Sequence, residues 1–158
     1  MQGTLGELIK THVRHGRIEW IGVRPERKAD VVTIEIAQLG EAGLEGDHAR
    51  PGNRALTLIQ AEHLPVIASF AGHNAIDPAL LRRNLVVSGI NLVALRKVSM
   101  TLGDATIQLT APCPPCSRME AALGQGGYNA MRGHGGWYAR VLSPGRLKIG
   151  DALTPIQP

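Results

Sequence analysis

The chain has 158 residues, of which 44% are apolar and 3% aromatic, and its formal net charge at pH 7 is +4. This length is sufficient for one domain with its own core, which leucine, isoleucine, valine and alanine must fill because aromatic residues are scarce. The positive charge comes without long Lys/Arg runs or stacking aromatics, so we expect a small anionic ligand rather than nucleic acid.

The N-terminal sequence and the cysteine content indicate where the protein works. The start, Met1-Gln2-Gly3-Thr4, has no apolar region of a signal peptide, and no apolar run approaches the roughly 18 residues of a membrane span. The only two cysteines are three positions apart, which is too few for a disulfide scaffold. We therefore expect a protein of the reducing cytoplasm without a membrane partner.

The expected secondary structure consists of short elements, most of them strands. In chain order these are a weak helix over 4–12, strands over 17–23 and 31–36, a loop over 40–52, a strand over 54–59, helices over 61–71 and 79–83, strands over 84–88, 98–102 and 105–110, a helix over 118–123, and strands over 137–142 and 146–149. The turns Gly103-Asp104 and Ser143-Pro144-Gly145 predict two hairpins. The expected fold is mainly β, a small antiparallel barrel with a few short helices on its rim, in a single domain over 1–158.

Cys113-Pro114-Pro115-Cys116 is the first segment whose chemistry a plain barrel does not require. The Ser-x-x-Glu spacing of Ser117 to Glu120 predicts a capping box, with a helix that ends at Gly124. Cys116 then lies just before a helix N-terminus, where free N–H groups and the helix dipole favour a thiolate. A thiolate suits a soft metal or sulfur-handling chemistry.

Other interpretations of the two cysteines stay open at this point. They can be buried structural residues, or a Cys113–Cys116 redox dithiol, although the two prolines keep the segment extended, unlike a thioredoxin-type motif. None of the six histidines forms a spaced pair with a neighbouring cysteine, which disfavours a structural zinc site.

Two further segments carry groups suited to anion binding. In Leu81-Arg82-Arg83-Asn84, the Arg82 guanidinium can bind a phosphate or a similar anion, and Asn84 offers an amide at a strand start. Residues 124–136 contain six glycines and Arg132, so backbone N–H groups can approach a ligand closely. The alternatives are a solvated helix end and a flexible surface loop. No nucleotide-binding glycine motif follows a strand.

Several segments, in order along the chain, resemble the MOSC family, which is named after the C-terminal domain of molybdenum cofactor sulfurase. The segments are Gly46-Asp47-His48, 56–62, 81–89, 112–120, 136–142 and Gly150-Asp151, and the resemblance is strongest over 40–153. It implies a barrel-like, mainly β domain that binds molybdenum cofactor or carries sulfur on a single key cysteine, here Cys116. In the related amidoxime-reducing proteins that cysteine ligates molybdenum, and an Arg-x-Asn element near the pterin phosphate matches Arg82 and Asn84.

The resemblance and the residue patterns together lead to one hypothesis with alternatives. The site residues expected are Cys116, as molybdenum ligand or persulfide carrier, with Arg82, Asn84 and Arg132 at the pterin phosphate, and Asp47 and His48 orienting the ligand or moving a proton. The expected cofactor is molybdenum cofactor (molybdopterin), whose pterin part is anionic, and we expect it to be bound loosely. The expected protein partner is a sulfur-donor protein or an electron-donating reductase. Reduction of N-hydroxylated compounds is the enzymatic alternative, and the sequence does not choose between enzyme and carrier.

Overall fold

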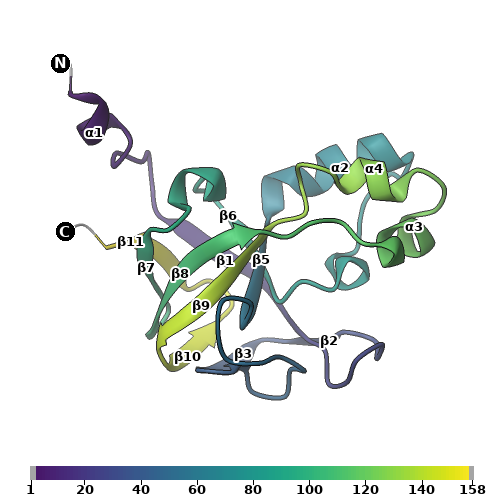
Figure 1. Ribbon diagram of the computed structural model, residues 1–158, viewed down its shortest axis with the longest axis horizontal. Coiled ribbons are helices and arrows are strands. Elements are labelled where there is room, and N and C mark those ends of the chain that lie inside the picture. The colour runs from purple at the N-terminus through teal and green to yellow at the C-terminus, as the bar shows by residue number, and fades with distance from the viewer. Residues whose placement is uncertain (1–2, 157–158) are drawn as a thin grey trace.

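A closed barrel of seven strands forms the centre of the computed structural model, which describes residues 3–156 (Figure 1). The barrel strands are β1 (Gly16–Val23), β5 (Leu56–Gln60), β6 (Leu85–Ser88), β7 (Ser99–Leu102), β8 (Ala105–Pro112), β9 (Trp137–Ser143) and β11 (Ala152–Pro155). Around the ring they follow the order β11, β7, β8, β9, β5, β6 and β1, and pairing of β1 with β11 closes it. The predicted mainly β barrel is confirmed. Residues 1, 2, 157 and 158 of the predicted domain lie outside the described range.

The barrel is mixed because one pair of neighbouring strands is parallel. β5 and β6 run parallel, with Leu58 opposite Leu85, whereas the other neighbours in the ring are antiparallel. Parallel strands need a long crossover connection, and residues 61–84 supply it with a helix and two 3₁₀ turns. The side chains of Leu56 and Leu58 pack inside the barrel, while Ile59 packs against the helices, so β5 is buried on both faces.

A smaller sheet lies beside the barrel, at the bottom of Figure 1. It consists of β10 (Gly145–Lys148), β3 (Ile36–Gly40) and β4 (Gly43–Leu44), while β2 (Val32–Ile34) extends the barrel sheet next to β1. The single strand predicted over 31–36 is therefore divided at Glu35 between two sheets, and the predicted loop over 40–52 contains β4.

The hairpin predicted around Ser143-Pro144-Gly145 is wrong. β9 and β10 follow each other in the chain, but β10 pairs with β3, from Gly145 opposite Leu39 to Lys148 opposite Ile36. The chain turns a corner at Pro144, and a Cβ atom on Gly145 would lie 2.3 Å from the carbonyl carbon of Asp104. Glycine leaves room for this close approach, and Leu147 of β10 packs in the main core. The hairpin around Gly103 is confirmed.

The remaining elements are short helices. They are α1 (Leu5–Leu8), η1 (Ala61–His63), α2 (Leu64–Ala71), η2 (Pro78–Leu81), η3 (Leu92–Leu95), α3 (Ser117–Leu123) and α4 (Gly127–Met131). Figure 1 shows α2, α3 and α4 gathered on one side of the barrel, with α1 standing apart near the N-terminus. Within residues 3–156, no helix is both long and apolar enough to cross a membrane.

Local signals predicted the helix ends around α2 and η2. Gly72 ends α2 in the left-handed conformation at φ 75°, and Pro65 lies in its first turn, as expected. The Asp77 carboxylate accepts a hydrogen bond from the Ala79 N–H at 3.0 Å, which confirms the predicted cap. The helix after that cap is a 3₁₀ turn that stops at Leu81, two residues earlier than predicted.

The capping box predicted at Ser117 does not form. α3 begins at Ser117 itself, Cys116 is its N-cap, and no side chain caps it. The Glu120 carboxylate instead accepts hydrogen bonds from the N–H groups of Gly126 at 2.9 Å and Tyr128 at 3.0 Å. These two bonds lower the pKa of Glu120 and fix the start of α4, a helix that the sequence did not predict.

Candidate functional site

The two cysteines lie in opposite environments. Cys113 is buried, its N–H donates to the Gly136 carbonyl at 2.8 Å, and burial raises the pKa of its thiol to about 11, although nearby arginines oppose the shift. Cys116 is exposed, and both cysteines are free. At neutral pH the Cys113 thiol therefore stays protonated and shielded, and Cys116 is the thiol that a ligand can reach.

The backbone around Cys116 leaves its sulfur available. Cys116 is extended at φ −134° and ψ 170°, and its carbonyl accepts the Met119 N–H at 2.9 Å, while its side chain makes no capping bond. A second hydrophobic core, separate from the one inside the barrel, contains Ile59. Met119 is buried in this second core together with Leu81, the last residue of η2. This packing brings the start of α3 to the end of η2, and so brings the Cys116 segment to the arginine that follows Leu81.

That arginine, Arg82, belongs to a group of cations. It adopts a left-handed conformation at φ 59°, and its guanidinium donates to the Ala29 carbonyl. Burial lowers the pKa of Arg82, and the charges of Arg118 and Arg24 lower it further, against smaller opposing effects from nearby carboxylates. We call Arg24, Arg82 and Arg118 the arginine cluster. Arg24 and Arg118 therefore lie close enough to Arg82 to add positive charge to its surroundings, which favours an anionic ligand.

Asp47 holds one member of the arginine cluster in place. Its buried carboxylate accepts hydrogen bonds from the Arg24 backbone N–H at 2.6 Å, from Nε at 3.1 Å and from Nη2 at 2.9 Å. Arg24 Nη1 in turn reaches the Arg82 carbonyl at 3.4 Å. The predicted site residue Asp47 is thus engaged with Arg24 rather than free to meet a ligand.

The neighbouring His48 is exposed, and its backbone N–H donates to the Arg24 carbonyl at 2.6 Å. Within residues 3–156 its imidazole forms no hydrogen bond. Arg132 is also exposed and contacts the Asn129 side chain at 3.4 Å. The structure therefore places both predicted residues at the surface without joining their side chains to the arginine cluster.

Asn84 is fully buried and its amide is already bonded. The oxygen accepts the N–H and the hydroxyl of Thr57, each at 3.1 Å, and the nitrogen donates to the Gly22 carbonyl at 3.1 Å. These bonds connect the residue before β6 to β5 and β1, two positions after Arg82. In this conformation Asn84 fixes the strands beneath the arginine cluster and presents no free amide group to a ligand.

Arg83 connects two segments of the site, a role that its local sequence did not indicate. Its Nε donates to the Gly135 carbonyl at 2.7 Å and its Nη1 to the Leu81 carbonyl at 3.0 Å, so it ties the glycine segment to η2. The glycines there serve close backbone packing. A Cβ atom on Gly135 would lie 2.4 Å from the Cys113 carbonyl oxygen, and one on Gly136 would lie 2.1 Å from that of Leu58.

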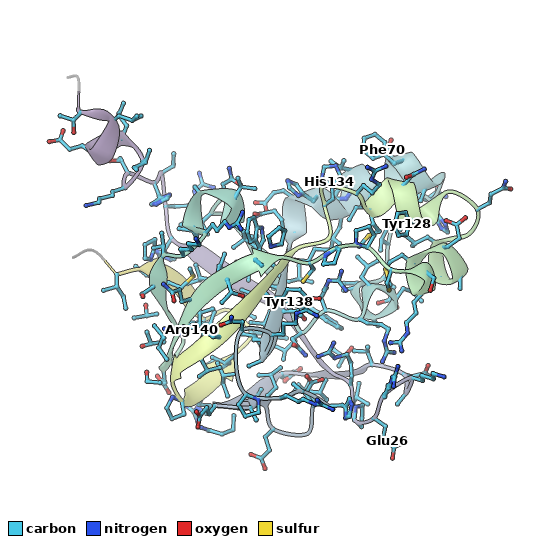
Figure 2. The ribbon with its side chains drawn as sticks, in the orientation of Figure 1. Glu26, Phe70, Tyr128, His134, Tyr138 and Arg140 are labelled. Atoms are coloured by element: carbon cyan, nitrogen blue, oxygen red, sulfur yellow. The ribbon has the colours of Figure 1, made fainter. Side chains whose placement is uncertain are left out.

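A pair of histidines, His63 and His134, also escaped the sequence analysis because the two are far apart in the chain. Their ring centroids are 5.0 Å apart at an interplanar angle of 83°, and Phe70 lies 5.9 Å from His134 (Figure 2). Burial and the charge of His134 lower the pKa of His63, which Glu62 partly offsets. Within the described range, His134 Nδ1 is buried without a hydrogen-bond partner.

Between residues 3 and 156, no group of three or more His, Cys, Asp or Glu side chains is arranged to hold a metal ion. Cys116 is therefore not part of such a group.

The chain thus combines a mixed β-barrel with an exposed thiol at a helix start and with arginines near the end of the β5–β6 crossover. The sequence profile of the MOSC domain matches residues 30–154, so the chain belongs to the MOSC domain family. No curated protein sequence matches the chain.

Solved structures with the same fold include three bacterial proteins. The YUAD protein of Bacillus subtilis aligns over 91% of this chain and 98% of its own, with 18% identity and a TM-score of 0.77. YiiM of Escherichia coli aligns over 90% of this chain and 70% of its own, with 23% identity and a TM-score of 0.71. YiiM of Geobacillus stearothermophilus covers 90% and 75%, with 21% identity and a TM-score of 0.72. At these identities the likeness concerns the fold.

Proposed function

We propose that the chain binds molybdenum cofactor, with the Cys116 thiolate as the protein ligand to the metal and the arginine cluster facing the anionic pterin. The observation that carries this proposal is the gathering of three arginines at Arg82, one of which, Arg118, lies two positions from an exposed thiol that makes no capping bond. Membership of the MOSC family supports it, because the family takes its name from molybdenum cofactor sulfurase.

The chemistry of the residues fits such a group. Thiolate sulfur is a soft ligand that suits a metal with sulfur neighbours, and guanidinium groups bind phosphate through paired N–H donors. Arg82 is proposed as the central phosphate-binding residue, because its backbone is fixed between η2 and β6 and it lies within electrostatic range of both other arginines. When bound, the cofactor supplies a redox-active metal centre.

Other residues act by positioning the arginine cluster. Asp47 fixes the guanidinium and backbone of Arg24, and Asn84 fixes the strand that follows Arg82. His48, exposed beside Asp47, is proposed to exchange protons with solvent near the ligand, and Arg132 to approach the phosphate from the end of α4. These two assignments require side-chain movement toward the arginine cluster.

Sulfur carriage is the second candidate, favoured by the contrast between the two cysteines. In this reaction the Cys116 thiolate attacks the outer sulfur of a donor protein's persulfide, which forms a Cys116 persulfide and releases the donor thiolate. A shielded Cys113 does not compete for that sulfur, because a thiol with a pKa of about 11 is not nucleophilic at neutral pH. The same property weakens the Cys113–Cys116 dithiol alternative. Reduction of N-hydroxylated compounds requires bound cofactor, so this activity should be assayed once cofactor binding has been demonstrated.

Elemental analysis for molybdenum and zinc tests the proposal on protein from a molybdate-fed host. We expect molybdenum in the unaltered protein and in Cys113→Ser, the matched control, and its loss in Cys116→Ser and Arg82→Gln. Equal molybdenum in Cys116→Ser would contradict the ligand assignment. Absence of molybdenum from all variants, with a persulfide found on Cys116 alone, would favour sulfur carriage.

A further inference from the structure

A groove on the outside of β8 and β9 is not used by the proposed site. It consists of two adjoining depressions of about 270 and 460 Å³, which share Asn53 and Thr110. We call it the β8–β9 groove. The other lining residues that matter here are Lys97, Gln108, Arg140, Arg54, Tyr138 and Pro114. Figure 2 shows Tyr138 and Arg140 away from His134, and both belong to β9.

The β8–β9 groove is positively charged throughout. Lys97 and Arg140 line one depression and Arg54 lines the other, all three are exposed, and none of the lining residues carries a carboxylate. Over the described residues, none of the three takes part in an ion pair. Like charges gathered without counter-charges repel one another, and an anionic partner relieves this repulsion.

The fold fixes the side chain of Arg54 and the backbone of Lys97. The Arg54 guanidinium carbon lies 4.8 Å from the centroid of the Tyr138 ring, a cation–π contact. Lys97 is left-handed at φ 61°, with its N–H bonded to the Leu109 carbonyl and its carbonyl bonded to Gln108 Nε2, each at 2.9 Å. A left-handed conformation costs free energy in a residue other than glycine and is frequent at functional sites.

The distribution of these groups favours one kind of ligand. The cations are spread along two depressions rather than converging on one point, as a single phosphate would require. The only aromatic ring lining the groove, Tyr138, has Arg54 over its face, which disfavours stacking of a nucleobase. An extended segment with several carboxylates matches spread cations, and the polar side chains of Asn53, Gln108 and Thr110 can bond its backbone.

We propose that the β8–β9 groove docks an acidic segment of a partner protein. The groove ends at Pro114, two positions before Cys116, so a partner docked there lies beside the exposed thiol. This inference goes beyond cofactor binding, because none of the groove cations belongs to the arginine cluster.

Fluorescence anisotropy with a labelled decaglutamate peptide tests the proposal at low ionic strength. We expect Arg54→Gln, Arg140→Gln and Lys97→Gly each to weaken binding about two- to five-fold, as loss of an exposed ion pair does, and the triple variant about tenfold or more. Lys97→Gly should leave the melting temperature unchanged or higher, because glycine adopts the left-handed conformation without strain.

Matched controls come from the turn after β1. Lys28 is also left-handed, at φ 77°, so Lys28→Gly removes the same charge and the same strain, and Arg27→Gln matches the arginine variants. Glu26, the neighbour of Arg27, lies far from Arg140 in Figure 2. We expect both controls, and Cys116→Ser, to bind the peptide normally, so this test is independent of the thiol.

Three results would overturn the inference. Equal weakening by the groove variants and the controls would mean non-specific attraction to a basic protein. Loss of binding in Arg82→Gln, with the groove variants unaffected, would place the peptide at the arginine cluster. Displacement of the peptide by inorganic pyrophosphate at lower concentration than by free hexaglutamate would indicate a phosphate ligand.

Discussion

Replacing Asp47 by Asn should destabilise the protein markedly, because Asp47 is the buried partner of Arg24. The Asp47 side chain is 0% exposed and that of Arg24 is 21% exposed, with 2.9 Å between Nη2 and Oδ2. Removing one partner of a buried ion pair leaves the other charge uncompensated. Here the charge left behind is a guanidinium that already repels Arg82.

The magnitude follows from the geometry. Breaking a buried ion pair costs about 3–5 kcal/mol. Two features reduce this value for Asp47→Asn: the Arg24 guanidinium retains some contact with water, and the Asn oxygen can still accept the Arg24 backbone N–H. We therefore expect a loss of about 2 kcal/mol in the free energy of unfolding. This corresponds to a fall of about 4–8 °C in melting temperature for a chain of this size.

Urea unfolding followed by circular dichroism measures this change. The midpoint should fall by about 1 M, since m is about 2 kcal/mol per M for a small protein. Glu19→Gln is the control, because Glu19 forms an exposed pair with Arg17 at 3.7 Å and its loss should cost less than about 1 kcal/mol. A midpoint for Asp47→Asn equal to that of Glu19→Gln would refute the reasoning. The double variant with Arg24→Gln should be less destabilised than the sum of the single variants.

Three further predictions concern the thiols, the glycine segment and the histidine pair. In native protein at pH 8, Ellman's reagent should modify one thiol rapidly. The Cys116→Ser variant should abolish this fast reaction, and the Cys113→Ser variant should retain it. Two rapidly modified thiols would contradict the burial of Cys113. The Gly136→Ala variant should lower the free energy of unfolding in urea by more than about 2 kcal/mol, because φ at this position is 89° and the new Cβ would lie 2.1 Å from the Leu58 carbonyl oxygen in β5. A smaller loss would mean that the backbone shifts easily to make room. Because the pKa of His63 is lowered in the folded state, the unfolded chain binds more protons between the lowered value and 6.5, so stability should fall as pH drops through that window. The variant His134→Gln should flatten this dependence in melting temperatures from pH 7.5 to 5, and parallel curves would exclude the coupling.

The sequence by itself determined the features that depend on neighbouring residues. Gly72 predicted the end of α2 and Asp77 predicted the cap of η2, because each acts on the backbone within a few positions. The motif around Cys116 singled out the thiol that the structure leaves exposed. The ordered segments over 40–153 were sufficient to indicate the family, which the profile match confirms.

Only the tertiary structure decided which of these elements pair or form hydrogen bonds with one another. Ser117 and Glu120 have capping-box spacing, yet Glu120 bonds the next helix, because α4 packs against α3 and offers two free N–H groups. β10 pairs with β3, far away in the chain, although it directly follows β9, which pairs with β5 and β8. The burial of Asn84 has the same origin: a hydrogen bond between distant strands depends on the closure of the barrel, which local sequence patterns do not encode.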